Sequence, residues 1–184
     1  GIGDRKPSSG GSADTGETRN GSNMETALFV ENLCYGDTGM LLTFPGRGLG
    51  NAAISAVANE EQLKEFGKLW AAMAITEPNC GSDSAAITTT AKKDGDDYIL
   101  NGEKIFVTAG ERGNAVVVWA TLDKEKGKAA IKSFVVKHGT PGMEVTRVEK
   151  KLGIRASDTA AIQFTDCRVP AANLLGSPEI DQKK

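Results

Sequence analysis

Two apolar segments of the sequence each end in a threonine, and each threonine is followed by a turn of small and polar residues. Residues 71–75 lead into Thr76, and residues 105–107 lead into Thr108. A strand that ends in this way places hydroxyl and backbone groups at the lip of a sheet. Such a lip can grip a flat polar ring, so these two strand ends are the first candidates for a binding site.

The turn after Thr76 has the composition of an anion-binding loop. Pro78 restricts Glu77 to extended conformations and cannot donate to a strand ladder, so the strand ends there. Residues 79–83 read Asn-Cys-Gly-Ser-Asp, and their backbone N–H groups and the Ser82 hydroxyl can hold a phosphate without Lys or Arg. A plain connecting loop is the alternative, and it stays open. Glu77 is expected to order this loop rather than to act as a catalytic base.

The second strand end offers an aromatic ring beside a hydroxyl. Phe106 can stack on a flat ligand, and Thr108 can hydrogen-bond a ring nitrogen. The alternative is a core phenylalanine at an ordinary strand end. The residues alone favour neither interpretation.

Helical periodicity precedes these strands, over residues 24–69. A first helix is expected to end near Gly36, and a second is expected near residues 49–57. The third has the clearest start, because Asn59 suits an N-cap and Gln62 stands in the capping-box position.

From residue 71 onward the periodicity is that of strands. Asn101-Gly102 predicts a type I′ turn joining strands at residues 98–100 and 103–107. With further strands near residues 87–93, 115–122, 131–137, 143–148 and 160–164, roughly seven are expected. Helices followed by strands predict an α+β fold whose strands form a β-barrel or sandwich.

Composition changes divide the chain into four parts. Residues 1–22 are polar and are expected to form a flexible leader, because they bury too little apolar surface to offset their ordering entropy. Residues 23–70 form the helical segment, residues 71–170 the β-domain, and residues 171–184 an exit.

Charge and composition exclude several classes of function. The 184 residues carry a formal charge of −2, from 22 basic and 24 acidic residues, so nucleic acid is not an expected partner. No apolar run approaches the ~20 residues of a transmembrane helix. Three widely spaced cysteines and a single histidine, His138, make a metal site improbable and favour a reducing compartment such as the cytoplasm.

Five segments resemble, in order and spacing, the middle domain of the acyl-CoA dehydrogenases. The clearest reads Ile75-Thr76-Glu77-Pro78-x-x-Gly81-Ser82-Asp83. The segments are residues 75–83, 98–104, 106–110, 151–159 and 164–170, and the agreement extends over about residues 73–176. The helix that begins at Asn59 resembles the end of that family's N-terminal helical domain.

The resemblance implies a flavin site at the two strand ends. In that family the matching threonines hydrogen-bond the isoalloxazine ring of FAD, and the residue matching Phe106, usually Trp, packs against it. The residue matching Ser82 lies between the flavin phosphates and the thioester end of the substrate, so Ser82 is also a substrate-binding candidate. The implied FAD contacts are Met73, Ala74, Ile75, Thr76, Gly81, Ser82, Phe106, Val107 and Thr108.

The resemblance also implies a reaction and partners. Members oxidise an acyl-CoA thioester to the 2,3-enoyl-CoA and pass the electrons to an electron-transfer flavoprotein. The catalytic base, a glutamate, comes from a C-terminal helical domain, so no catalytic residue is assigned within this chain. The chain is thus expected to be a fragment of a homodimer or homotetramer, in the cytoplasm or, in a eukaryote, the mitochondrial matrix.

Three other functions stay open. One is an acyl-CoA oxidase or flavin monooxygenase on the same scaffold, which oxygen consumption would distinguish. Another is a non-catalytic partner subunit of a dehydrogenase complex, and the third is a β-barrel that binds a different ligand. Arg155 and Asp158 likewise allow two interpretations, a place near the coenzyme A side or a structural Arg–Asp pair.

Overall fold

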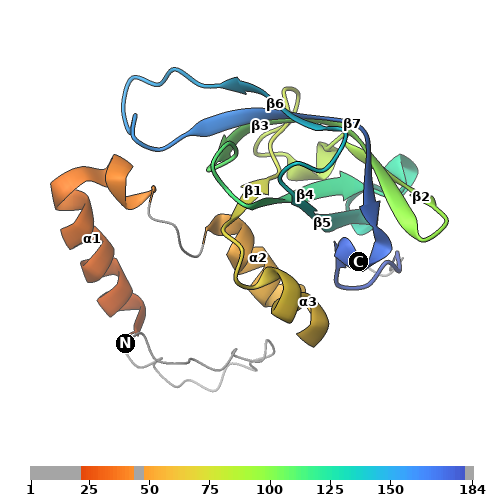
Figure 1. Cartoon of the computed structure of the whole chain (residues 1–184), viewed down its shortest axis with the longest axis horizontal. Coiled ribbons are helices and arrows are strands. Elements are labelled where there is room, and N and C mark those ends of the chain that lie inside the picture. The colour runs from red at the N-terminus through yellow and green to blue at the C-terminus, as the bar shows by residue number, and fades with distance from the viewer. Residues whose placement is uncertain (1–21, 44–47, 181–184) are drawn as a thin grey trace.

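The computed structural model describes residues 22–43 and 48–180 of the chain (Figure 1). Helices come first and strands follow, which confirms the predicted α+β class. The helices are α1 (Ser22–Leu41), α2 (Leu49–Val57) and α3 (Glu60–Phe66). The strands are β1 (Ala71–Ala74), β2 (Thr90–Asp94), β3 (Asp97–Thr108), β4 (Ala115–Thr121), β5 (Ile131–Lys137), β6 (Met143–Val148), β7 (Thr159–Pro170) and β8 (Leu174–Leu175).

All eight strands belong to one mixed sheet that folds over on itself. Its order is β6-β7-β3-β2-β4-β5-β8, and β1 pairs with β4 in parallel. In Figure 1, β3 and β7 form an upper layer, β4 and β5 lie beneath it, and α2 and α3 lie below β4 and β5. The sheet is open between β6 and β8 in the described part of the chain, so it is a sandwich-like layer pair of eight strands.

Two apolar cores correspond to these layers. Side chains of β3 and β7, such as Leu100 and Phe164, pack against Val116 and Phe134 of β4 and β5. The opposite face of β4 and β5 packs with Ile54 of α2 and Phe66 of α3 in the second core. Burial of each such side chain stabilises the fold by about 1.5–3 kcal/mol, so the β-layers hold the strands firmly in register.

The predicted helix signals mostly hold. In α3, the Asn59 side chain accepts a hydrogen bond from the Gln62 N–H (2.9 Å) and Gln62 reciprocates, which confirms the capping box. The first helix departs from helical geometry at Asp37, next to the expected end at Gly36, and then adds a further turn to Leu41. The Asp37 carboxylate accepts the Met40 N–H (2.9 Å), which caps that added turn.

The hairpin expected at Asn101-Gly102 is wrong. β3 runs without a turn through these residues, and the tight turn instead joins β2 to β3 around Gly95, whose φ is +59°. Gly102 has φ +148° and lies at an irregularity in the pairing of β3 with β7. A Cβ at Gly102 would collide with Thr89, so this Asn-Gly pair provides a bulge with room for a close neighbour rather than a chain reversal.

The expected leader, residues 1–22, lies outside the described residues except for Ser22, and so do residues 181–184 of the exit. The four-part division of the chain therefore stays a prediction. No helix among the described residues has the length and apolarity needed to cross a membrane.

Candidate functional site

The two predicted strand ends lie along one strip where β1 passes β3. The Ile105 N–H donates to the Thr76 carbonyl (2.9 Å), and the Asn114 N–H, beyond the end of β3, donates to the Trp70 carbonyl (2.8 Å). Because the later donor binds the earlier acceptor, residues 70–76 and residues 105–114 run in opposite directions. Thr76 and Thr108 therefore lie at opposite ends of the strip, separated by about three residues of strand, roughly 10 Å.

Phe106 lies between the two threonines and faces outward. Its side chain is 61% exposed, and its φ is +56°, an uncommon conformation for a bulky residue. The strained residue sits in a bulge, because the pairing of β3 with β7 breaks between Lys104 and Val107. A bulge re-aims a side chain, here toward solvent, and the alternative of a core phenylalanine is wrong.

The polar groups of the strip are available to a ligand. Within residues 22–43 and 48–180, no protein group hydrogen-bonds the hydroxyls of Thr76, Thr108 or Ser82. Both threonines are half-buried, and Ser82 is exposed. A Cβ at Gly81 would meet no atom within 4 Å, so the space beside this glycine is open.

The remaining candidate residues of the two strand ends, residues 73–75 and 107, are buried or half-buried. Ala74 and Val107 are buried, whereas Met73 of β1 and Ile75, which follows β1, are half-buried. Their backbone atoms, rather than long side chains, are what this part of the strip offers.

The turn after Thr76 is tied together by Glu77. Its backbone exchanges two hydrogen bonds with Cys80 (2.9 and 3.2 Å), and its carboxylate accepts the N–H groups of Thr88 (2.6 Å) and Thr89 (3.0 Å) and the Thr88 hydroxyl (2.7 Å). The fourth contact is the Lys104 ammonium at 2.7 Å. These bonds support the interpretation that Glu77 orders the loop.

The environment of Glu77 keeps it ionised. Burial alone raises its pKa, but the hydrogen bonds from Lys104, Thr89 and Thr88 outweigh that effect and lower the pKa to about 2. The carboxylate is also 3% exposed with its oxygens engaged, so it is unsuited to take a proton from a ligand. Burial, together with the charge of Glu77, raises the pKa of the neighbouring Cys80 thiol, which disfavours a thiolate nucleophile.

A second buried carboxylate holds the turn that follows Thr108. Asp158 accepts the Glu111 N–H (2.8 Å) and pairs with the Arg112 guanidinium (2.9 Å), while its carbonyl accepts the Ala109 N–H (3.2 Å). The alternative of a structural pair between Arg155 and Asp158 is wrong, because Asp158 pairs with Arg112. Arg155 is exposed instead.

A cavity of about 570 Å³ opens beside Thr108. It lies between the end of α1, α2 and the start of β1, and Leu42, Leu49, Ala52 and Trp70 supply most of its apolar lining. The sequence interpretation missed it, because residues 49–57 and Trp70 were treated as parts of amphipathic helices and the residues before 49 as a connection. Their apolar periodicity is the same whether a face packs on protein or lines a cavity.

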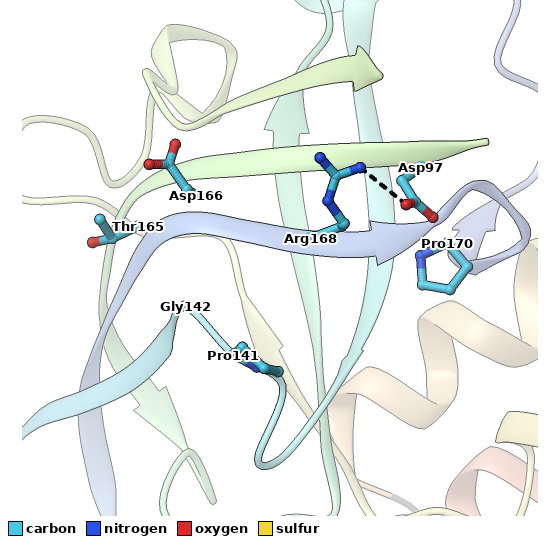
Figure 2. A pocket seen from close by; sticks show the side chains of 7 residues that line it. All are labelled: Asp97, Pro141, Gly142, Thr165, Asp166, Arg168 and Pro170. Carbon is cyan, nitrogen blue, oxygen red and sulfur yellow. Dashed lines mark hydrogen bonds and ion pairs between the residues drawn. The ribbon is translucent and has the colours of Figure 1, made fainter. Parts of the chain in front are cut away.

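A second hollow, of about 490 Å³, lies at the opposite end of β3 (Figure 2). Figure 2 shows Arg168 reaching from β7 to Asp97, and Asp94 binds the same guanidinium. The charge of Arg168 is thus already compensated. The lining of this hollow includes the Thr165 hydroxyl but no aromatic ring, so it is not the candidate site. No cluster of metal-ligating side chains occurs among the residues described.

Comparison with known proteins assigns the family. A family model described as acyl-CoA dehydrogenase, middle domain, matches residues 72–167, more than half of the chain. The chain belongs to the acyl-CoA dehydrogenase family. The members of this family are flavoprotein oxidoreductases, and the matched range includes both strand ends, residues 73–76 and 106–108.

Named relatives within the acyl-CoA dehydrogenase family agree. A probable medium-chain specific acyl-CoA dehydrogenase 2, mitochondrial, from Caenorhabditis briggsae is 38% identical over 84% of the chain and 40% of its own length. An acryloyl-CoA reductase (NADH) from Anaerotignum propionicum is 46% identical over 62% of the chain and 29% of its own length. The butyryl-CoA dehydrogenase structure from Megasphaera elsdenii aligns with TM-score 0.78 and 37% identity over 91% of the chain and 45% of its own length. The chain thus spans less than half of each of these proteins.

Proposed function

We propose that the strip between Thr76 and Thr108 binds the isoalloxazine ring of FAD. The single observation that carries this proposal is the outward, left-handed Phe106 between two half-buried threonines whose hydroxyls have no protein partner in the described structure. An aromatic face and two hydrogen-bonding groups in line suit a flat, polar, three-ring system.

In this proposal, different residues contact different parts of the FAD molecule. The Thr76 and Thr108 hydroxyls and the backbone of residues 73–75 and 107 contact the ring, and Phe106 packs against it. Gly81 and Ser82 lie in the exposed turn, where backbone N–H groups and a hydroxyl suit the flavin phosphates. Ser82 is also the proposed contact to the substrate.

The proposed reaction is the α,β-dehydrogenation of an acyl-CoA thioester to the 2,3-enoyl-CoA. When bound, FAD supplies the acceptor for the hydride that leaves the β-carbon, while the α-proton passes to a base. The chain's own contribution is to hold and orient the ring. The apolar cavity beside Thr108 offers a place for an acyl group next to that ring, because its lining is mostly Leu, Ala and Trp.

The partners proposed are an acyl-CoA substrate, an electron-transfer flavoprotein and further copies of the complete protein, as a homodimer or homotetramer. The compartment proposed is the cytoplasm, or the mitochondrial matrix if the source is eukaryotic. Support comes from the family and from the Caenorhabditis briggsae relative, which is named mitochondrial.

A second candidate is the reverse direction, reduction of an enoyl-CoA. The relative named acryloyl-CoA reductase (NADH), 46% identical over the matched residues, favours it. The same strip would serve both directions, since the ring geometry does not depend on which way electrons flow.

Full-length protein loaded with FAD tests the proposed function. With an acyl-CoA and an artificial electron acceptor, the thioester product should be lighter by two hydrogens, as measured by mass spectrometry. With an enoyl-CoA and NADH, a heavier product would select the second candidate. A folded protein that purifies without flavin and takes up none from added FAD contradicts both.

A further inference from the structure

Lys104 is the one lysine among the described residues whose side chain is fully buried. Its exposure is 0%, although it lies on β3 only two residues before the exposed Phe106. Burying an ammonium group costs several kcal/mol unless it is paired and hydrogen-bonded. A lysine in this position therefore has a role that an apolar residue of the same length would not fill.

The Lys104 ammonium binds the chain on both sides of Thr76. It donates to the Ile75 carbonyl (3.0 Å) and to the Glu77 carboxylate (2.7 Å). The next residue on β3, Ile105, donates its N–H to the Thr76 carbonyl (2.9 Å). Three consecutive residues, 75–77, are thus fixed to β3, which leaves the Thr76 side chain little freedom of direction.

The same lysine marks the start of the bulge that carries Phe106. Lys104 pairs with Ile162 of β7, and regular pairing resumes only at Val107 with Ala160. Lys104 turns into the interior to reach Glu77, and in a regular strand Phe106, two residues later, would face the same way. The bulge between Lys104 and Val107 reverses this and directs the strained Phe106 outward. One buried ion pair thus joins the segment that contains Thr76 to the bulge that contains Phe106.

Glu77 extends this link to the segment before β2. Its carboxylate takes the N–H groups of Thr88 and Thr89, so residues 84–89 are held against the turn that contains Gly81 and Ser82. The pair is a junction of three segments, and none of its polar atoms is directed at solvent.

We propose that the Lys104–Glu77 ion pair is the positioning element of the FAD strip, which fixes Thr76 and Phe106 relative to each other; this inference rests on the proposed function. Neither residue contacts the ring. The pair acts through the backbone of residues 75–77 and through the bulge at residues 105–106.

The test compares Lys104→Met, Glu77→Gln and the double variant in the full-length protein. Each single variant leaves one buried charge without its opposite charge, so it can fail to fold. The double variant removes both charges with side chains of similar size and keeps the test usable. Arg168→Met is the matched control, because it breaks an ion pair on β7 at the far end of β3.

The readouts are the FAD dissociation constant, the visible absorption spectrum of bound FAD, and amide hydrogen exchange of the FAD-free protein. In the folded double variant, FAD binding should weaken at least 10-fold and the flavin spectrum should shift. Exchange at the Ile105 N–H should become faster, because its Thr76 acceptor is released. Arg168→Met should match the wild type in all three.

The outcomes are distinguishable. A wild type that takes up no FAD overturns the proposed function and the positioning role with it. A wild type that binds FAD, with a folded double variant of equal affinity, equal spectrum and equal exchange at Ile105, overturns the positioning role alone.

Discussion

At the scale of single residues, Phe106 combines strain with exposure. A bulky residue in the left-handed region costs about 1–2 kcal/mol relative to a relaxed conformation. Its side chain is 61% exposed, so packing within the described chain does not repay that cost. This combination supports the proposal that Phe106 packs against the flavin ring.

Phe106→Gly should therefore separate stability from binding. Glycine adopts this backbone without strain, so the FAD-free protein should gain about 1 kcal/mol in its free energy of unfolding. Loss of the aromatic contact should weaken FAD binding by about 10-fold. Urea denaturation and FAD titration measure the two effects.

Ile154→Gly is the matched control, because Ile154 is also left-handed (φ +51°) but lies in the loop before β7. It should raise stability by a similar amount and leave FAD affinity unchanged. If both glycine variants weaken FAD binding equally, the specific role of Phe106 is refuted.

Glu77 gives the protein a specific acid sensitivity. Its folded pKa of about 2 lies below the ordinary value of 4.5, so its contribution to stability is full above pH 4.5 and is lost as the pH falls from 4.5 toward 2. Between pH 7 and pH 3 the wild type should lose about 2 kcal/mol more than Glu77→Gln/Lys104→Met. Urea denaturation at both pH values checks this, and parallel losses in the two proteins would exclude the linkage.

At the scale of elements, β3 carries Phe106, Thr108 and Lys104, and Gly102 allows this strand to pass close to Thr89. A Cβ there would lie 2.7 Å from the Thr89 Cα, at a φ of +148° that only glycine adopts freely. Gly102→Ala should cost about 3 kcal/mol, because neither backbone can move without disturbing the sheet. Gly95→Ala, at φ +59° in an open turn, should cost only about 1 kcal/mol. Equal costs, measured by thermal denaturation, would contradict this account.

Local signals predicted the elements better than their connections. The Asn59 capping box, the strand at residues 131–137 and the strand at residues 143–148 follow from short-range chemistry and are confirmed. The Asn101-Gly102 turn failed because Thr89, which precedes Gly102 by thirteen residues, packs against it, so a hairpin signal becomes a bulge.

In the candidate site, too, features set by local sequence could be predicted and features set by distant contacts could not. Its threonines, glycine and serine could be selected from turn composition and resemblance, and their assignment to FAD stays a prediction. The Lys104–Glu77 pair and the Arg112–Asp158 pair were not predicted, because partners 27 and 46 residues apart meet only through the pairing of strands. No short-range pattern reports such contacts.

At the scale of the whole molecule, the strip is open on one side. The chain spans 29–40% of the length of the curated relatives described above, and well-formed ligand sites bury most of their ligand. The 184-residue chain alone should therefore bind FAD at least 10-fold more weakly than the full-length protein. Titration of both, with circular dichroism to confirm folding of the shorter chain, checks this. Equal affinities would mean that the strip is complete without further sequence.

The most direct test of the central claim is FAD titration of the full-length protein and of its Thr76→Val and Thr108→Val variants. Valine keeps the shape of threonine and removes only the hydroxyl. The wild type should bind one FAD per chain, each variant should bind about 10-fold more weakly, and the double variant about 100-fold. A wild type that binds no FAD, or variants that bind it as tightly as the wild type does, would contradict the account.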